Sequence, residues 1–123
     1  MTDTENKVTF EQARNVASQA AKSELGQFAP VNMTDVLSDF YMEAEGCWFF
    51  FGSDEIVIPK DKGIVASGVY AVTRTGALSY VYDFRENEEQ MRAYLEMFSL
   101  YSLGRREEAH AAWSAFKEKY NLG

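Results

Sequence analysis

Gly46-Cys47-Trp48-Phe49-Phe50-Phe51-Gly52-Ser53-Asp54-Glu55 is the stretch that decides the fold of this chain. It sets four consecutive aromatic side chains between two glycines and closes with two acids. An apolar run this short, bounded by turn residues, is typical of a strand that is buried on both faces or lines a cavity. Because the stretch contains no recognisable catalytic group, the residues alone favour a binding domain.

Period-two patterns around this strand predict an antiparallel meander. Upstream, two alternating sets of side chains indicate a half-buried strand, which Gly46 joins to the aromatic strand in a hairpin. The first set holds Val36, Phe40, Met42 and Ala44, and the second holds Leu37, Asp39, Tyr41, Glu43 and Glu45. Residues 55–59 extend the aromatic strand or form an edge, because Pro59 cannot donate a ladder hydrogen bond. Stretches 64–73 and 78–84 predict two more strands.

Helices are predicted on both sides of these strands in the sequence. Thr9 and an amide three positions later form a capping box, and the helix that follows presents a narrow face of small residues until Gly26 ends it. Asn87 caps a second helix, which Gly104 ends, and residues 105–120 add a third. The predicted fold is therefore α+β: an N-terminal helix, a four-stranded antiparallel meander sheet and two C-terminal helices packed on the sheet.

Length and composition favour a single domain, 1–123, with residues 1–8 flexible. Hydrophobic residues make up 46% of the chain and aromatics 15%, which suits one real core and excludes a disordered chain. The N-terminus lacks the features of a signal peptide, and no apolar run approaches the roughly 20 residues of a membrane span. We therefore expect a soluble, cytoplasmic protein. Cys47, the only cysteine, is expected to be a small buried hydrophobe.

The net charge of −7 limits the classes of partner. Negative charge repels the phosphates of nucleic acids and anionic membrane surfaces, so neither is expected to bind. A basic protein partner is favoured instead. The alternative is that the acidity only keeps the domain soluble.

No group of residues predicts catalysis, a metal site or a cofactor. The only histidine, His110, lies in the third predicted helix, where a solvent-exposed position is expected rather than a catalytic one. One cysteine and one histidine cannot supply a zinc site, and the glycines form no phosphate-binding fingerprint. The chain is therefore not expected to be an enzyme.

Acidic side chains on the strand before Gly46 form the surface most readily linked to a function. A strand face with alternating acids is usually just solvated, and its functional alternative is a stripe that binds a protein, with Tyr41 as aromatic anchor. Acid–base catalysis would need a cleft that raises one carboxyl pKa, which the sequence does not indicate. The predicted partner-binding residues are Asp39, Tyr41, Glu43, Glu45, Asp54 and Glu55.

Three segments together resemble the YrhB-like immunity-protein family of bacterial polymorphic toxin systems. They are the strand Gly46-Cys47-Trp48-Phe49-Phe50-Phe51, the stretch 69–78 with its Thr-Gly turn, and a helix with Glu89, Met91, Tyr94 and Leu95. The similarity covers about residues 10–101, and Arg74 stands where the family usually has an acid. The resemblance implies a non-enzymatic protein that binds a cognate toxin and neutralises it by occlusion. An acidic surface suits a toxin with a basic cleft.

Two other hypotheses about the function also fit the sequence. The first is a small-ligand binding or enzymatic domain resembling the NTF2-like class, with Trp48, Phe50, Tyr80 and Tyr82 lining a cavity in a curved sheet. A deep pocket with convergent polar groups would favour it, and a sheet face filled by helix side chains would count against it. The second is a structural subunit whose aromatic face pairs with a copy of itself as a homodimer.

Overall fold

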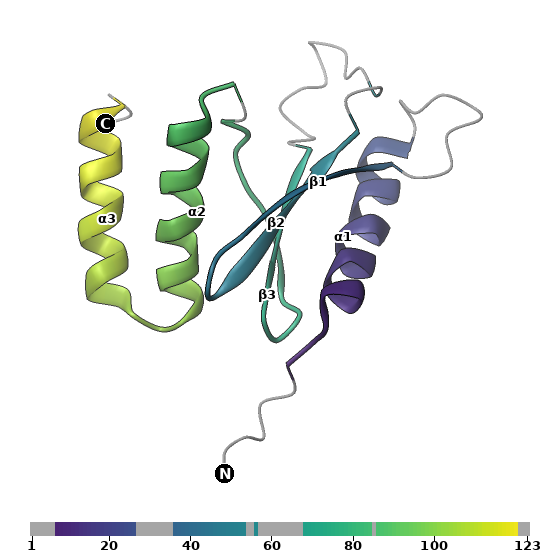
Figure 1. Ribbon diagram of the computed structural model, residues 1–123, viewed down its shortest axis with the longest axis horizontal. Coiled ribbons are helices and arrows are strands. Elements are labelled where there is room, and N and C mark those ends of the chain that lie inside the picture. Colours follow the sequence, from purple (N-terminus) through teal and green to yellow (C-terminus); the bar gives the residue numbers. More distant parts are fainter. Residues whose placement is uncertain (1–6, 27–35, 54–55, 57–67, 85, 121–123) are drawn as a thin grey trace.

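The computed structural model describes residues 7–26, 36–53, 56, 68–84 and 86–120. It confirms the predicted α+β order of one helix, four antiparallel strands and two helices (Figure 1). The elements are α1 (Phe10–Leu25), β1 (Leu37–Glu43), β2 (Cys47–Gly52), β3 (Val69–Thr73), β4 (Leu78–Tyr80), α2 (Glu88–Ser102) and α3 (Arg106–Lys119). The predicted connection 27–34 and residues 57–67 lie outside the described residues.

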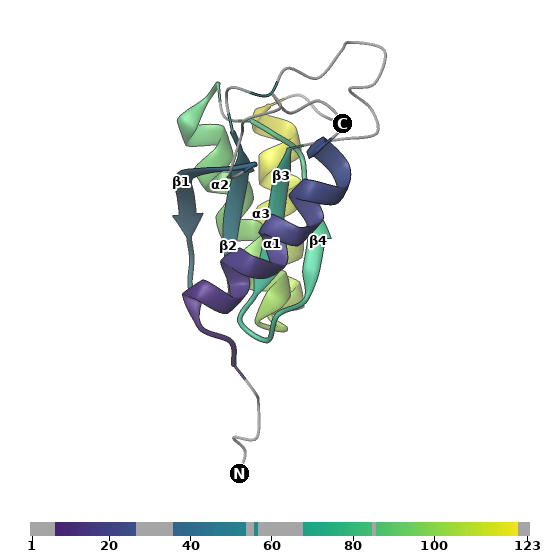
Figure 2. The same ribbon diagram turned by 90° about the vertical axis from the view of Figure 1, so that its right-hand side faces the viewer.

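The sheet is a meander with strand order β1-β2-β3-β4, so β1 and β4 form its two edges (Figure 2). The aromatic strand β2 is central and pairs antiparallel with both neighbours, Phe50 lying opposite Tyr41 on one side and Tyr70 on the other. All six residues of β2 are buried. The expectation of a strand buried on both faces is therefore confirmed, and all four of its aromatics are core residues.

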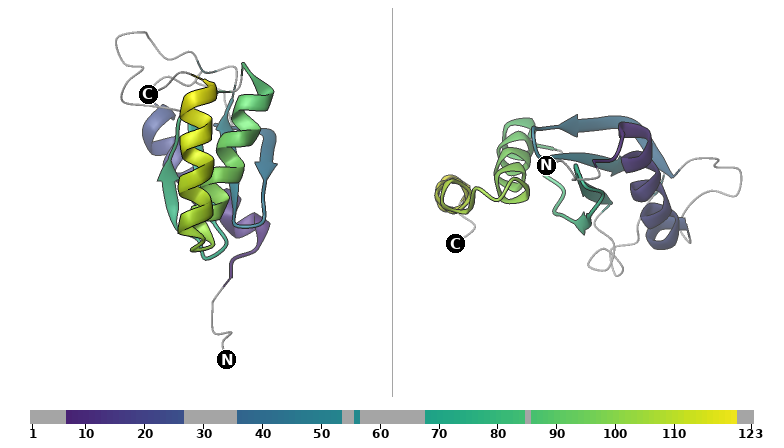
Figure 3. Two further views of the ribbon diagram at one scale, coloured as in Figure 1. Left: turned by 90° about the vertical axis from the view of Figure 1, so that its left-hand side faces the viewer. Right: turned by 90° about the horizontal axis from the view of Figure 1, so that it is seen from below.

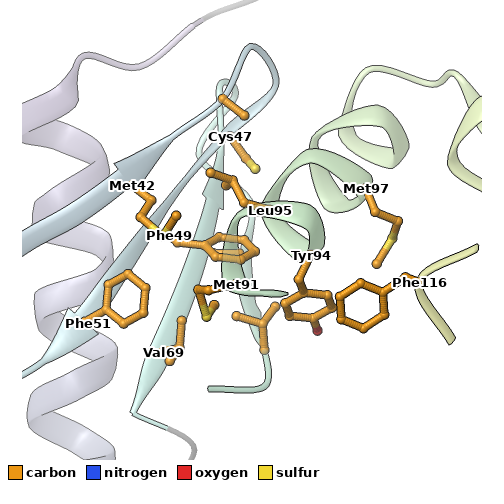
Figure 4. Close-up of a cluster of buried hydrophobic side chains, with 13 residues drawn as sticks. Met42, Cys47, Phe49, Phe51, Val69, Met91, Tyr94, Leu95, Met97 and Phe116 are labelled. Carbon is orange, nitrogen blue, oxygen red and sulfur yellow. The ribbon is translucent and has the colours of Figure 1, made fainter. Parts of the chain in front are cut away.

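Alternate side chains of β2 enter two separate cores. Trp48 and Phe50 point to α1, where four alanines allow the helix to approach the sheet closely. Phe49 and Phe51 point to the opposite face, which α2 covers (Figure 4). Around them pack buried side chains from the sheet, α2 and α3, including Met42, Cys47, Val69, Met91, Tyr94, Leu95 and Phe116.

The helix ends follow the predicted caps. The Thr9 hydroxyl accepts a hydrogen bond of 3.1 Å from the Gln12 N–H, and the Gln12 side chain accepts one of 2.8 Å from the Thr9 N–H. Asn87 caps α2 through a 3.1 Å bond from the Gln90 N–H. Gly104 has φ of +79°, a left-handed conformation that favours glycine, and it separates α2 from α3.

The two C-terminal helices differ from the prediction in how they pack. Only α2 lies on the sheet, and α3 packs mainly against the outer side of α2 (Figures 1 and 3). Phe116 of α3 still reaches the edge of the core, with its ring centroid 5.8 Å from that of Tyr94 and 5.6 Å from that of Phe84. The third helix therefore packs mainly on the second helix and not on the sheet.

The last strand is shorter than the stretch 78–84 that alternation predicted, because β4 ends at Tyr80. Beyond it the backbone turns toward α2: the Tyr82 N–H lies 3.4 Å from the Tyr94 hydroxyl oxygen and the Phe84 N–H 3.1 Å from the Met91 sulfur. The Val81 N–H still donates to the Val69 carbonyl oxygen at 3.3 Å, but from Tyr82 onward contacts with the helix replace sheet pairing. A period-two pattern does not reveal this change.

A candidate partner-binding surface on the first strand

Strand β1 carries a bulge that changes which of its side chains are exposed. Leu37 pairs with Gly52 and Tyr41 with Phe50, so three residues of β1 lie opposite the single residue Phe51. Inside the bulge the Ser38 hydroxyl accepts a hydrogen bond of 2.8 Å from the Phe40 N–H. Bulges at sheet edges bend the strand and redirect its side chains. Here the bulge includes Phe40 and lies next to Tyr41.

Two large aromatic side chains project from β1 on opposite faces. Tyr41 is 42% exposed, and its ring lies 4.7 Å from that of Phe10 on the α1 side. Phe40 is 50% exposed, and its ring lies 5.0 Å from that of Phe51 on the α2 side. Each ring therefore rests on the core with one side and meets solvent with the other. Tyr41, predicted as an aromatic anchor for a partner, is therefore accessible, and its role in binding stays a prediction.

Phe40 is half exposed, although alternation predicts it on the buried face with Val36, Met42 and Ala44. Met42 and Ala44 are buried on the α2 side, whereas Val36 is buried on the α1 side. Phe40 does face the α2 side, but it lies at the sheet edge, in the bulge, where the helix does not cover it. An exposed aromatic of this size is the functional candidate that sequence reasoning missed.

Glu43 is bound to Arg74, which lies in the turn between β3 and β4. The two side chains form an ion pair of 3.0 Å, and the guanidinium carbon of Arg74 lies 4.0 Å from the centre of the Trp48 ring. Arg74 also donates a hydrogen bond of 3.0 Å to the Glu45 carbonyl oxygen. It therefore joins the two turns at this end of the sheet and holds the Glu43 carboxylate in place.

Glu45 and Asp39 occupy the two ends of the predicted acidic stripe. Glu45 is exposed in the β1–β2 turn, 3.9 Å from Arg105, an exposed pair that contributes little to stability. Asp39 is exposed in the bulge. The structure thus brings Asp39, Tyr41 and Glu43 together on β1, with Glu45 just beyond. Asp54 and Glu55, the remaining predicted residues, lie outside the described residues.

The β1–β2 turn is fastened to α2. The Gly46 N–H donates a buried hydrogen bond of 2.7 Å to the Ser99 hydroxyl, and the Arg92 guanidinium lies 3.3 Å from the Glu43 carbonyl oxygen. A Cβ at position 46 would lie 2.5 Å from the Ser99 carbonyl oxygen, so only glycine permits this approach. The acidic end of β1 is therefore held on a rigid support.

Cys47 lies in the core and His110 lies on the surface of α3. Cys47 is fully buried, as predicted, and burial raises the pKa of its thiol from 9.0 to about 12. His110 is exposed on α3, beside the ring of Tyr101 at 6.4 Å. In the part of the chain that the structure describes, no group of three or more His, Cys, Asp or Glu residues gathers around a metal-sized site. No described helix has the length and apolar character needed to cross a membrane.

The four aromatics proposed to line a cavity do not share one. Trp48 and Phe50 are buried against α1, whereas Tyr80 and Tyr82 are 56% and 66% exposed. Tyr82 also lies on the other side of the molecule, with its ring 6.3 Å from that of Tyr94 on α2. Helix side chains fill the α2 face of the sheet, the arrangement that counts against the cavity reading.

A groove of about 360 Å³ lies between α2 and α3, away from the sheet. Its lining is mostly apolar, with Ala93, Met97 and Phe116 among its residues. Glu89 and Lys119 also line it and form an ion pair of 3.1 Å, and this hydrogen bond raises the pKa of Lys119. No convergent set of polar groups comparable to a ligand site lies among these residues.

Comparisons of the chain with protein-family models, with curated proteins and with solved structures find no match.

Proposed function

We propose that this chain is a non-catalytic immunity protein that binds a cognate bacterial toxin and neutralises it by occlusion. The observation that carries the proposal is the pair of half-exposed aromatics, Phe40 and Tyr41, between the acids Asp39 and Glu43 on an edge strand. Aromatic side chains in such positions are frequent energetic centres of protein interfaces. The resemblance to the immunity-protein family supports the same function.

The net charge of this chain indicates what kind of surface the toxin should have. With a net charge of −7, the chain attracts a basic surface and repels other acidic proteins. Such attraction mainly accelerates association, while the desolvated aromatic contacts slow dissociation. A toxin whose active-site cleft binds an anionic substrate would present this kind of basic surface, and β1 would cover it.

The firm attachment of β1 supports occlusion rather than induced folding. Arg74 holds the Glu43 carboxylate, and Ser99 holds the turn at Gly46. A binding surface that is already ordered loses less conformational entropy when a partner binds. We therefore expect tight binding with little change in the sheet.

Association kinetics with a toxic protein encoded next to this gene, identified first by its toxicity on expression, test the proposal. Asp39→Lys and Glu45→Lys reverse two exposed charges and leave the Glu43–Arg74 pair intact. Each should lower the association rate constant at low salt by about threefold to tenfold, with a smaller effect at high salt. Glu118→Lys makes the same charge change on exposed α3 and is the matched control. Equal association rates for all three variants would remove β1 from the interface, and absence of any toxin binding would overturn the function.

A further inference from the structure

The hydrogen-bond pattern of the β1–β2 hairpin shows which backbone groups of β1 face outward. The Ala44 N–H donates to the Cys47 carbonyl at 2.9 Å, so these residues form a hydrogen-bonded pair. Pairs alternate along an antiparallel ladder. Tyr41 and Glu43, which face Phe50 and Trp48, are therefore non-hydrogen-bonded pairs, and their N–H and C=O groups point away from β2.

This outward edge is closed at both ends and open between them. At one end the Ser38 hydroxyl binds the Phe40 N–H, and at the other Arg92 approaches the Glu43 carbonyl oxygen. Two donors and one acceptor remain in the open part: the Tyr41 N–H, the Tyr41 carbonyl and the Glu43 N–H. None of these three groups has a protein partner among the described residues. Proteins usually block such edges, because an unpaired row of backbone groups invites another strand.

The side chains around the open edge indicate which kind of strand would pair with it. A strand added beside Tyr41 would meet the Phe40 ring on one face of the sheet and the Tyr41 ring on the other. Asp39 and Glu43 would lie beside its alternate side chains, where one cationic residue would pair with Asp39 and another would share the Glu43 carboxylate with Arg74. A second copy of β1 would instead bring like charges together, which is destabilising. The edge therefore favours a basic segment over self-pairing.

We propose that β1 binds its partner by β-augmentation: an extended segment rich in lysine or arginine adds to the sheet as a new strand beside Tyr41 and Glu43. This inference rests on the proposed function and specifies the part of the toxin that is recognised. Main-chain hydrogen bonds to Tyr41 and Glu43 supply affinity, and the aromatic rings and acids supply selectivity.

Amide hydrogen exchange with a defined probe tests the inference without the toxin. The probe is a short synthetic peptide in which lysine alternates with valine, titrated to millimolar concentration into the isotope-labelled protein. Exchange at the Tyr41 and Glu43 amides should slow by about tenfold or more. The Leu78 and Tyr80 amides are the internal control, because the ladder places them on the outward side of the opposite edge strand, β4.

Two further peptides complete the test. A peptide N-methylated at every residue has no backbone N–H to donate on either edge and cannot form the ladder, and one with glutamate in place of lysine has the wrong charge. Both should leave Tyr41 and Glu43 unprotected. The inference is overturned if the basic peptide protects neither amide, if the N-methylated peptide protects them equally, or if Leu78 and Tyr80 gain the same protection. Toxin neutralisation without protection by the basic peptide would retain the proposed function and reject β-augmentation. Protection without neutralisation would retain the open edge and reject the function.

Discussion

The β1–β2 turn lies so close to α2 that one added methyl group at Gly46 should loosen it. A Cβ at position 46 would lie 2.5 Å from the Ser99 carbonyl oxygen and 2.9 Å from Cγ of Leu103. The first of these atoms belongs to a helix backbone and cannot move aside easily. Gly46→Ala must therefore shift the turn away from the helix and weaken the buried bond between the Gly46 N–H and the Ser99 hydroxyl.

The magnitude follows from opposing effects. Overpacking typically costs about 1–3 kcal/mol, and weakening a buried hydrogen bond costs about 1 kcal/mol more. Alanine returns about 0.4–1 kcal/mol by restricting the unfolded chain, because the φ of Gly46 lies outside the left-handed region. We expect Gly46→Ala to lower the free energy of unfolding by about 2 kcal/mol, and Tm by roughly 6–10 °C for a domain of this size.

Urea unfolding followed by tryptophan fluorescence measures this change. Gly26→Ala is the matched control, because Gly26 ends α1 with helical backbone angles and an added Cβ would have no atom within 4 Å. That variant should keep or slightly raise the free energy of unfolding. If Gly46→Ala unfolds at the same urea concentration as Gly26→Ala and the wild type, the turn is not held against α2 as described.

Two further predictions concern Arg74 and the pH dependence of stability. Arg74→Met should lower the free energy of unfolding by about 2 kcal/mol, because it removes the ion pair with Glu43 and the contact of the guanidinium with the Trp48 ring. Arg92→Met, at an exposed site, should lower it by less than about 1 kcal/mol. Urea unfolding of both variants measures the difference. Because burial raises the thiol pKa of Cys47 from 9.0 to about 12, the unfolded chain releases this proton first, and stability should fall as pH rises through that window. The slope due to this thiol is at most about 1.4 kcal/mol per pH unit and should be absent in Cys47→Ala, which thermal unfolding at several pH values measures. A wild type and Cys47→Ala with the same pH dependence would contradict the buried thiol.

Local signals explain why much of the fold could be predicted. Thr9 and Asn87 are helix caps whose hydrogen bonds involve residues only three positions away. The central position of the aromatic strand could be predicted from its length and its flanking glycines alone, because six consecutive residues buried on both sides require a central position in a sheet. The short turns at Gly46 and Gly76 predicted the two hairpins of the meander, β1–β2 and β3–β4.

The candidate surface was predicted only in part, because its decisive features are not local. The bulge in β1 leaves the period-two pattern of Tyr41 and Glu43 unchanged, so the sequence shows no sign of it. Exposure of Phe40 depends on where the helix stops covering the sheet. Arg74 contacts Glu43 across 31 positions, although a meander does place the two turns at the same end of the sheet, and that register was the available signal.

Growth rescue tests the central claim most directly. Cells that express a neighbouring gene whose product is toxic receive the wild-type chain, Tyr41→Ala, or the control Glu118→Lys, each checked for an unchanged fold by circular dichroism. The wild type and Glu118→Lys should restore growth, and Tyr41→Ala should not, because it removes an aromatic anchor of the β1 surface. Failure of the wild type to restore growth, or full rescue by Tyr41→Ala, would contradict the proposal that this surface neutralises a toxin.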